Sequence, residues 1–346
     1  MRAETTMVVN PPQVACYRIR DGVVKVVRKE SIILVSPVDG TSVRMSPVAE
    51  ELMTLLAQGA LFEQLASKLR EKYPTARDHD SKLTGFLGQL AKAGLLDSEA
   101  KALPRTWRAP RVVLFHPDRA AALVARWIKV VPAWLGWTVL YGTLLASVVG
   151  IVGLIGAGQL PPLRGVVTQF SGWGFALFVL LVVPLHESSH AIACRLAGAP
   201  VGAAGIVMHG WLVPGPFVET SQSYRLRERS RRFWIPAAGP AVNLLATGAA
   251  AWGLLLIGPH HPYAPAILDY VFLLGAIFVY LDTNPLSPSD GSHMLEAILD
   301  DELIRRSALS KKRSRLSAQK NVAIYRIVCS THLQASAVLA YFWWKM

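Results

Sequence analysis

Two histidines and a glutamate stand at the spacing of a catalytic zinc site. The sequence reads His186-Glu187-Ser188-Ser189-His190. Residues four apart lie on the same face of an α-helix, so the imidazoles of His186 and His190 can converge on one metal ion. Glu187 can then serve as the general base that takes a proton from water. This pattern predicts zinc-dependent hydrolysis.

The residues before this motif are apolar. Residues 175–185 read FALFVLLVVPL. A charged side chain at the centre of a membrane-spanning helix costs roughly 2.5–3.5 kcal/mol or more. Ionisable groups at such a depth are functional by default, which favours a metal site over a structural histidine pair.

A catalytic zinc site needs a third protein ligand and keeps one position open. The candidate is Asp290, because prolines and a glycine interrupt a predicted span over residues 284–291. A broken helix at membrane depth is expected only where it lines a site. A second break is expected at residues 238–243, where the amide of Asn243 could orient the scissile carbonyl or stabilise an oxyanion.

The composition divides the chain into two parts. Of 346 residues, 52% are hydrophobic and 17% are charged, which is too apolar for an ordinary soluble protein. Residues 130–222 hold only four formally charged side chains: Arg164, Glu187, Arg195 and Glu219. We therefore expect a soluble N-terminal domain, residues 1–105, a linker and juxtamembrane segment, residues 106–130, and a membrane domain, residues 131–346.

Five membrane-spanning helices are expected. They lie near residues 131–157, 169–198, 235–257, 264–286 and 321–343. The net charge of +13 also suits a nucleic-acid-binding protein, but its basic residues cluster in segments 225–232 and 305–320, between spans. That pattern is typical of cytoplasmic loops, so we expect a multi-pass protein of the cell membrane with a cytoplasmic N-terminal domain and no nucleic-acid partner. The oligomeric state is left open.

Residues 200–217 are apolar but too rich in glycine and proline for a helix. They are predicted to form short strands or a re-entrant loop. Such backbone at membrane depth must be shielded by protein or line a wet cavity. An exposed strand edge there could dock an extended substrate peptide.

The N-terminal domain is predicted to be an α+β, winged-helix-like unit. Strands are expected over residues 14–20, 23–28, 31–36 and 42–45. Ser46 and Pro47 predict the start of a helix that runs to about residue 57. Two further helices are expected over residues 61–73 and 82–93.

The three motifs of the membrane domain together resemble the site-2 protease family of intramembrane zinc metalloproteases. They are His186-Glu187-x-x-His190, Gly239-Pro240-x-x-Asn243, and Asn284-Pro285 followed by Asp290-Gly291. The resemblance implies Zn²⁺ held by His186, His190 and Asp290, with Glu187 and Asn243 as catalytic residues. One departure is Asp282, which stands where the family usually has asparagine. The roles of Asp282, His209 and His293 are left open.

Residues 14–98 resemble the PqqD-like domains that recognise the leader of ribosomally made, post-translationally modified peptides. The likeness rests on Ser46-Pro-Val-Ala-Glu-Glu-Leu-Met, on the stretch after Gly59, and on Leu90-x-x-x-Gly94-Leu-Leu96. It implies that a leader peptide adds as a strand beside residues 42–45 and packs on the third helix. A DNA-binding winged helix is the alternative for this domain.

These features lead to a first hypothesis and two alternatives. The first is an intramembrane zinc endopeptidase that removes the leader from a modified precursor peptide. The second is cleavage of a membrane-bound transcriptional regulator, with the N-terminal domain as sensor. The third is a catalytically silent membrane protein that binds a peptide or confers immunity.

Overall fold

The computed structural model describes most of the chain. The described residues are 16–28, 31–35, 42–46, 49–74, 78–97, 111–209, 213–257, 260, 263–310 and 318–345. The chain divides into two compact units, Met1–Arg108 and Ala109–Met346.

The first unit combines a small antiparallel sheet with helices, as predicted. In the described residues, strands β2 (Val24–Val27), β3 (Ile32–Val35) and β4 (Ser42–Met45) form a sheet in the order β2-β3-β4. The side chains of the central strand β3 are completely buried, and those of Ile32 and Leu34 belong to the core of this unit. A second pairing joins β1 (Cys16–Tyr17) to β5 (Ala60–Leu61).

The helices of this unit are α1 (Glu50–Gln58), α2 (Phe62–Lys72) and α3 (His79–Lys92). Their leucines build the core together with the sheet. Helix α1 is described from Glu50, and Ala49 N–H donates a hydrogen bond to the Ser46 carbonyl. The predicted start at Ser46 and Pro47 is not tested, because residues 47 and 48 separate Ser46 from the described helix. Pro47 lies outside the described residues.

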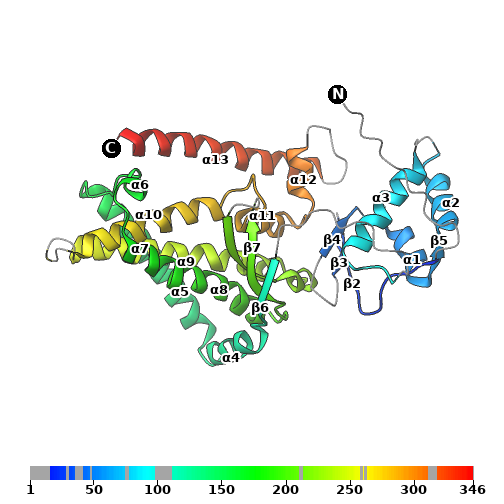
Figure 1. Ribbon diagram of the computed structural model, residues 1–346, viewed down its shortest axis with the longest axis horizontal. Coiled ribbons are helices and arrows are strands. Elements are labelled where there is room, and N and C mark those ends of the chain that lie inside the picture. Colours follow the sequence, from blue (N-terminus) through cyan, green and yellow to red (C-terminus); the bar gives the residue numbers. More distant parts are fainter. Residues whose placement is uncertain are drawn as a thin grey trace. The chain divides into compact units, whose positions relative to one another are not determined.

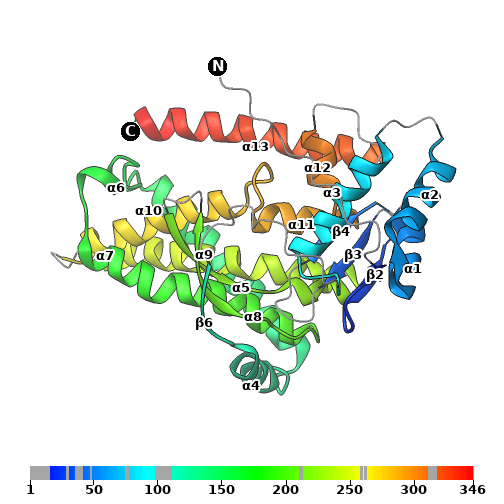
Figure 2. The same ribbon diagram turned by 45° about the vertical axis from the view of Figure 1, so that its right-hand side comes forward.

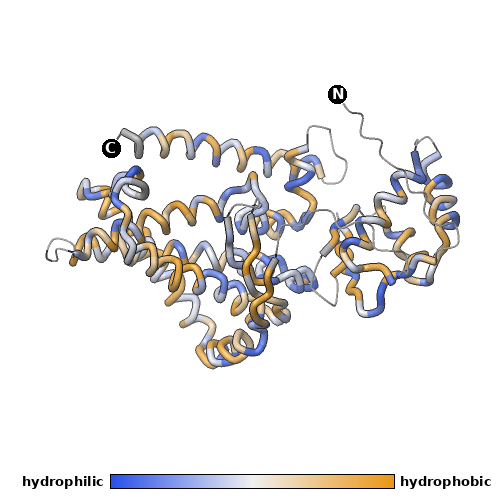
Figure 3. The backbone as a smooth tube through the Cα atoms, viewed as in Figure 1, coloured by the Kyte–Doolittle hydropathy of each residue, from blue (hydrophilic) through white to orange (hydrophobic). Residues whose placement is uncertain are grey.

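The second unit contains the five predicted spans. Within the described residues, five helices are long and apolar enough to cross a membrane. They are α5 (Ala133–Gly156), the continuous run of α7 (Gly172–Leu177), η2 (Phe178–Val182) and α8 (Val183–Leu196), α9 (Arg229–Leu256), α10 (Ala264–Asp282) and α13 (Gln319–Lys345). In Figure 3, α10 is apolar over most of its length, whereas α13 alternates between apolar and polar residues.

Helix α9 corrects the predicted break at residues 238–243. It begins at Arg229 and continues through Pro236 and Pro240 to Leu256. A proline inside a helix costs about 3 kcal/mol or more, but α9 packs against α5, α8, α10 and α11 (Asp290–Leu299), as Figures 1 and 2 show. Tertiary packing around a central helix outweighs the lost backbone hydrogen bonds.

A three-stranded antiparallel sheet accompanies these helices. Its order is β6 (Arg111–Phe115), β7 (Ala204–His209) and β8 (Val213–Val218). The prediction of strands within residues 200–217 is confirmed. Strand β6 and helix α4 (Asp118–Ile128) lie in residues that sequence reasoning treated as linker and juxtamembrane segment, and both pack on the second unit.

Shorter elements complete the unit. They are α6 (Gly165–Thr168), η3 (Ser221–Arg225) and α12 (Ile304–Leu309). Helix α10 ends at Asp282, and α11 begins at Asp290. The predicted break after the fourth span is therefore confirmed.

Candidate metal centre

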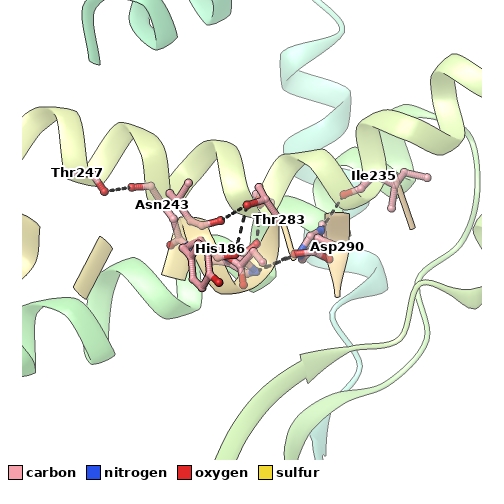
Figure 4. A network of polar contacts seen from close by, with 11 residues as sticks. His186, Ile235, Asn243, Thr247, Thr283 and Asp290 are labelled. Atoms are coloured by element: carbon pink, nitrogen blue, oxygen red, sulfur yellow. Dashed lines mark hydrogen bonds and ion pairs between the residues drawn. The ribbon is translucent and has the colours of Figure 1, made fainter. Parts of the chain in front are cut away.

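The three side chains predicted as zinc ligands lie together. His186 and His190 come from one face of α8, and Asp290 comes from the first turn of α11. In Figure 4, the Asp290 carboxylate points at the histidine rings. In the described residues, these three side chains each offer one donor atom, and the three donor atoms lie within 4.8 Å of one another. They could therefore hold one metal ion.

The distances fit a tetrahedral ion. Nε2 of His186 and Nε2 of His190 are 3.2 Å apart. Oδ2 of Asp290 lies 3.5 Å from the first nitrogen and 3.3 Å from the second. Zinc bonds of about 2.0–2.2 Å separate two ligands of a tetrahedron by about 3.3–3.5 Å. The donor triangle therefore has the size of one tetrahedral face.

Local structure fixes Asp290 in this place. The Ser289 side chain caps α11 by accepting a hydrogen bond from Ser292 N–H. A Cβ atom at Gly291 would collide with the Thr283 carbonyl, so only glycine lets the start of α11 approach the end of α10 this closely. Burial raises the pKa of Asp290, but hydrogen bonds with His186 and His190 outweigh it and hold the pKa below its ordinary value.

A backbone carbonyl orients His190. Its Nδ1 donates a hydrogen bond to the Ile235 carbonyl of α9 at 2.7 Å (Figure 4). That bond places the proton on Nδ1 and leaves Nε2 free for a metal, as is usual for zinc-binding histidines. His190 is 8% exposed, so the ring is held firmly.

Gly239 brings α9 against the same nitrogens. A Cβ atom at this position would collide with Nε2 of both His186 and His190. The absence of a side chain is therefore a steric condition for the site. The sequence predicts a helix break at Gly239, whereas its close approach to the histidines depends on how α8 and α9 pack.

Asn243 and Asp282 lie behind His186. The amide Nδ2 of Asn243 donates to Asp282 Oδ2 at 2.7 Å and lies 3.0 Å from His186 Nδ1. The same Asp282 oxygen is 3.7 Å from that ring nitrogen. Asp282 thus lies close to the outer nitrogen of His186 without a hydrogen bond to it, and its contact with the ring runs through the Asn243 amide. Asn243 is completely buried, and its Oδ1 has no hydrogen-bond partner among the described residues.

Glu187 lies between the ligands and the sheet. The backbone N–H of Val218, at the end of β8, donates a hydrogen bond to its carboxylate. This contact joins β8 to the residue predicted as general base.

The register of the sheet shows which groups β8 presents on its open edge. Residues 214, 216 and 218 of β8 face residues 208, 206 and 204 of β7. Since Pro214 and Pro216 lack N–H groups, the alternate pairs at 213, 215 and 217 make the hydrogen bonds to β7. The carbonyls of Pro214 and Pro216 therefore point to the open edge, on the same side as Val218 N–H.

His293 does not join the donor triangle. His293 Nδ1 lies 2.8 Å from Glu296 Oε2, one turn along α11. The side chain of His209 lies outside the described residues. Neither finding gives these residues a ligand role.

One family model matches part of the chain. Residues 174–264 match the model of Peptidase family M50. The match contains His186, Glu187, His190 and Asn243, and ends before Asp290. Members of this family are intramembrane metalloproteases that generally depend on zinc, so the match supports the predicted likeness to site-2 proteases. No curated protein and no solved structure matches the chain.

Proposed function

We propose that the protein is an intramembrane zinc endopeptidase. The observation that carries this proposal is the tetrahedral donor triangle of His186, His190 and Asp290, with Glu187 beside it on an apolar helix. These three residues would hold the ion. Zinc in such a site acts as a Lewis acid and lowers the pKa of water.

Glu187 acts as the general base and then as the general acid. Its carboxylate takes a proton from the attacking water and delivers it to the leaving amine. The hydrogen bond from Val218 N–H keeps the side chain beside β8, where the scissile bond would lie.

Asn243 acts chiefly by positioning His186. Its Nδ2 is engaged with Asp282 and lies beside the ring nitrogen that faces away from the donor triangle. These contacts favour an orienting role over direct stabilisation of an oxyanion.

The substrate peptide lies in an extended form along the open edge of β8. There it donates N–H groups to the carbonyls of Pro214 and Pro216. Because those prolines offer no N–H in return, positions 214 and 216 of the edge accept hydrogen bonds but do not donate them, and the N–H of Val218 is engaged by Glu187. A bound peptide therefore finds no N–H partner for its own carbonyls at these two positions.

The preferred substrate is a modified precursor peptide whose leader binds the first unit. Two features support this choice. One is the likeness of residues 14–98 to leader-recognition domains. The other is that, within the described residues, β4 pairs only with β3, which leaves one edge of the sheet for an added strand. The basic segments between spans favour a cytoplasmic position for this unit and for the opening of the site.

A titration tests the choice of substrate. A labelled leader peptide from a candidate precursor is added to the full-length Glu187→Gln variant in detergent, and its fluorescence anisotropy is recorded. The proposal predicts saturable binding that a scrambled leader does not compete with. Cleavage of the precursor without leader binding would instead favour the alternative in which the enzyme cuts a membrane-bound regulator.

The zinc content distinguishes an enzyme from the third alternative, a catalytically silent protein. A protein that binds leader peptides but contains no zinc, and gains none when zinc is supplied, would be a silent binding or immunity protein. The proposal predicts about one zinc ion per chain, lost in the His186→Ala variant.

A further inference from the structure

Helix α4 has three distinct faces. Ala121 and Ala125 are buried against α8. On the opposite face, apolar side chains are exposed, among them Leu123 and Trp127, the latter 69% exposed. Between these faces runs a basic flank with Arg126 and Lys129.

The exposed apolar face belongs at the edge of the bilayer. Helix α4 leads through Val130, Val131 and Pro132 directly into α5, a membrane-spanning helix. Val130 is 74% exposed and continues the apolar face. Helices with tryptophan and leucine on one side and basic residues on the other lie in the membrane interface.

A basic cavity opens on the flank of this helix. Its volume is about 390 Å³, and it lies between α4 and the end of α8. Its lining consists of Ala122, Ala125, Arg126, Lys129, Arg195 and Gly198. Arg195 is paired with Asp118 at 3.2 Å, and Asp118 also accepts a hydrogen bond from Val201 N–H at 2.8 Å. In the described part of the chain, the side chains of Arg126 and Lys129 have no polar partner.

The charges around the cavity leave a net positive value. Three cations surround it, and Asp118 supplies one negative charge. The carbonyl of Ala197 at the end of α8 already accepts a hydrogen bond from Arg231. The cavity therefore keeps a net positive charge, which suits the single negative charge of a phosphodiester.

We propose that this cavity binds the headgroup of an anionic phospholipid, with the acyl chains along the exposed apolar face of α4. The ligand joins two features that lie side by side: the basic cavity takes the phosphate, and Leu123, Trp127 and Val130 take the chains. A free anion would use the first feature but not the second. The site thereby fixes α4 against the membrane at the start of the first span.

The test uses native mass spectrometry of the purified full-length protein in detergent. Phosphatidylglycerol and phosphatidylcholine with identical acyl chains are titrated separately. The proposal predicts preferential retention of phosphatidylglycerol. In the Arg126→Gln/Lys129→Gln variant, the affinity for phosphatidylglycerol falls about fivefold for each charge removed, while that for phosphatidylcholine is unchanged.

Two matched variants control for folding and for overall charge. Arg126→Lys/Lys129→Arg keeps both charges and is expected to keep the preference. Arg227→Gln/Lys320→Gln removes two exposed charges elsewhere in the same unit and is also expected to keep it. If the double α4 variant fails to fold, the single variant Lys129→Gln, at an exposed position, serves with an expected fivefold loss.

Three results would overturn the proposal. The first is equal retention of the two lipids by the parent protein. The second is an unchanged preference in the α4 variant. The third is displacement of phosphatidylglycerol by millimolar inorganic phosphate, which would identify a site for free anions.

Discussion

Gly239 lies where the site has no room for a side chain. We predict that Gly239→Ala, which costs about 1–3 kcal/mol through overpacking, pushes α9 away from the histidine nitrogens and lowers zinc affinity about ten- to hundredfold. Competition with a chelator measures this. Gly142→Ala in α5 is the control, because a Cβ atom there meets nothing within 4 Å. Equal zinc affinity in the two variants would contradict the proposed closeness of α9.

Asp282 marks the departure from the family pattern, and its oxygen is an acceptor for Asn243. We expect Asp282→Ala to weaken zinc binding about ten- to hundredfold, as losses of groups behind a metal ligand do. Asp282→Asn retains an acceptor oxygen and should stay close to the parent protein. Zinc content after dialysis against a chelator distinguishes the two, with Asp269→Ala on the same helix as control. Equal losses in both Asp282 variants would assign the effect to the negative charge instead.

At the scale of elements, a buried ion network joins α9 to the turn after α11. Arg232 bonds to Glu302 at 2.6 Å and also to Asp300, and both Arg232 and Glu302 are nearly completely buried. Removal of one partner from a buried pair costs about 3–5 kcal/mol, because the other charge is left uncompensated. We predict that Arg232→Ala sharply lowers the thermal unfolding midpoint and loosens zinc binding through Asp290.

The control for the Arg232→Ala variant is a substitution of Arg227, which is exposed. Arg227→Ala should leave both the midpoint and the zinc content unchanged. A variant with apolar residues at both 232 and 302 should recover much of the lost stability. If Arg232→Ala behaves like Arg227→Ala, the network does not hold α11 in place.

The prolines of β8 make a prediction about substrate binding. Pro216→Ala adds one N–H to the open edge, and one hydrogen bond contributes about 0.5–1.5 kcal/mol. We therefore expect the KM for a precursor peptide to fall about two- to tenfold. Pro162→Ala, in the loop before α6, is the control. An unchanged KM for Pro216→Ala would show that the peptide does not lie along β8.

The sequence predicted the elements whose signal is local. Ligands four residues apart require a helix, and the prolines before Asp290 require a break. Signals that depend on tertiary contacts were missed. Pro240 indicated a break in α9, but packing on four helices preserves the helix. Strand β6 has five residues, and it becomes a strand only through its pairing with β7.

Around the metal ligands, local motifs likewise predict some residues, whereas other contacts depend on tertiary packing. His186, His190 and Asp290 were predicted from motifs, and the structure brings them together. The approach of Gly239 to the histidine nitrogens depends on how α8 and α9 cross. No local pattern in the sequence predicts this crossing. The placement of Asp282 beside His186 likewise follows from the position where α10 ends.

At the scale of the whole molecule, the proposed function gives the two units separate tasks. The second unit carries the donor triangle and the spans that surround it. The first unit has its own core and an open strand edge within its described residues. Recognition by one unit and chemistry in the other allow a peptide to be selected by its leader and cut elsewhere.

The Glu187→Gln variant tests whether Glu187 is the general base of a zinc-dependent cleavage. Purified full-length parent and variant are compared for cleavage of a candidate precursor and for zinc per chain. Loss of a general base lowers the rate about 10²–10⁴-fold, while the amide leaves the three ligands in place. We expect a drop of at least about a hundredfold with unchanged zinc content. Cleavage at the parent rate by a variant with full zinc would contradict it.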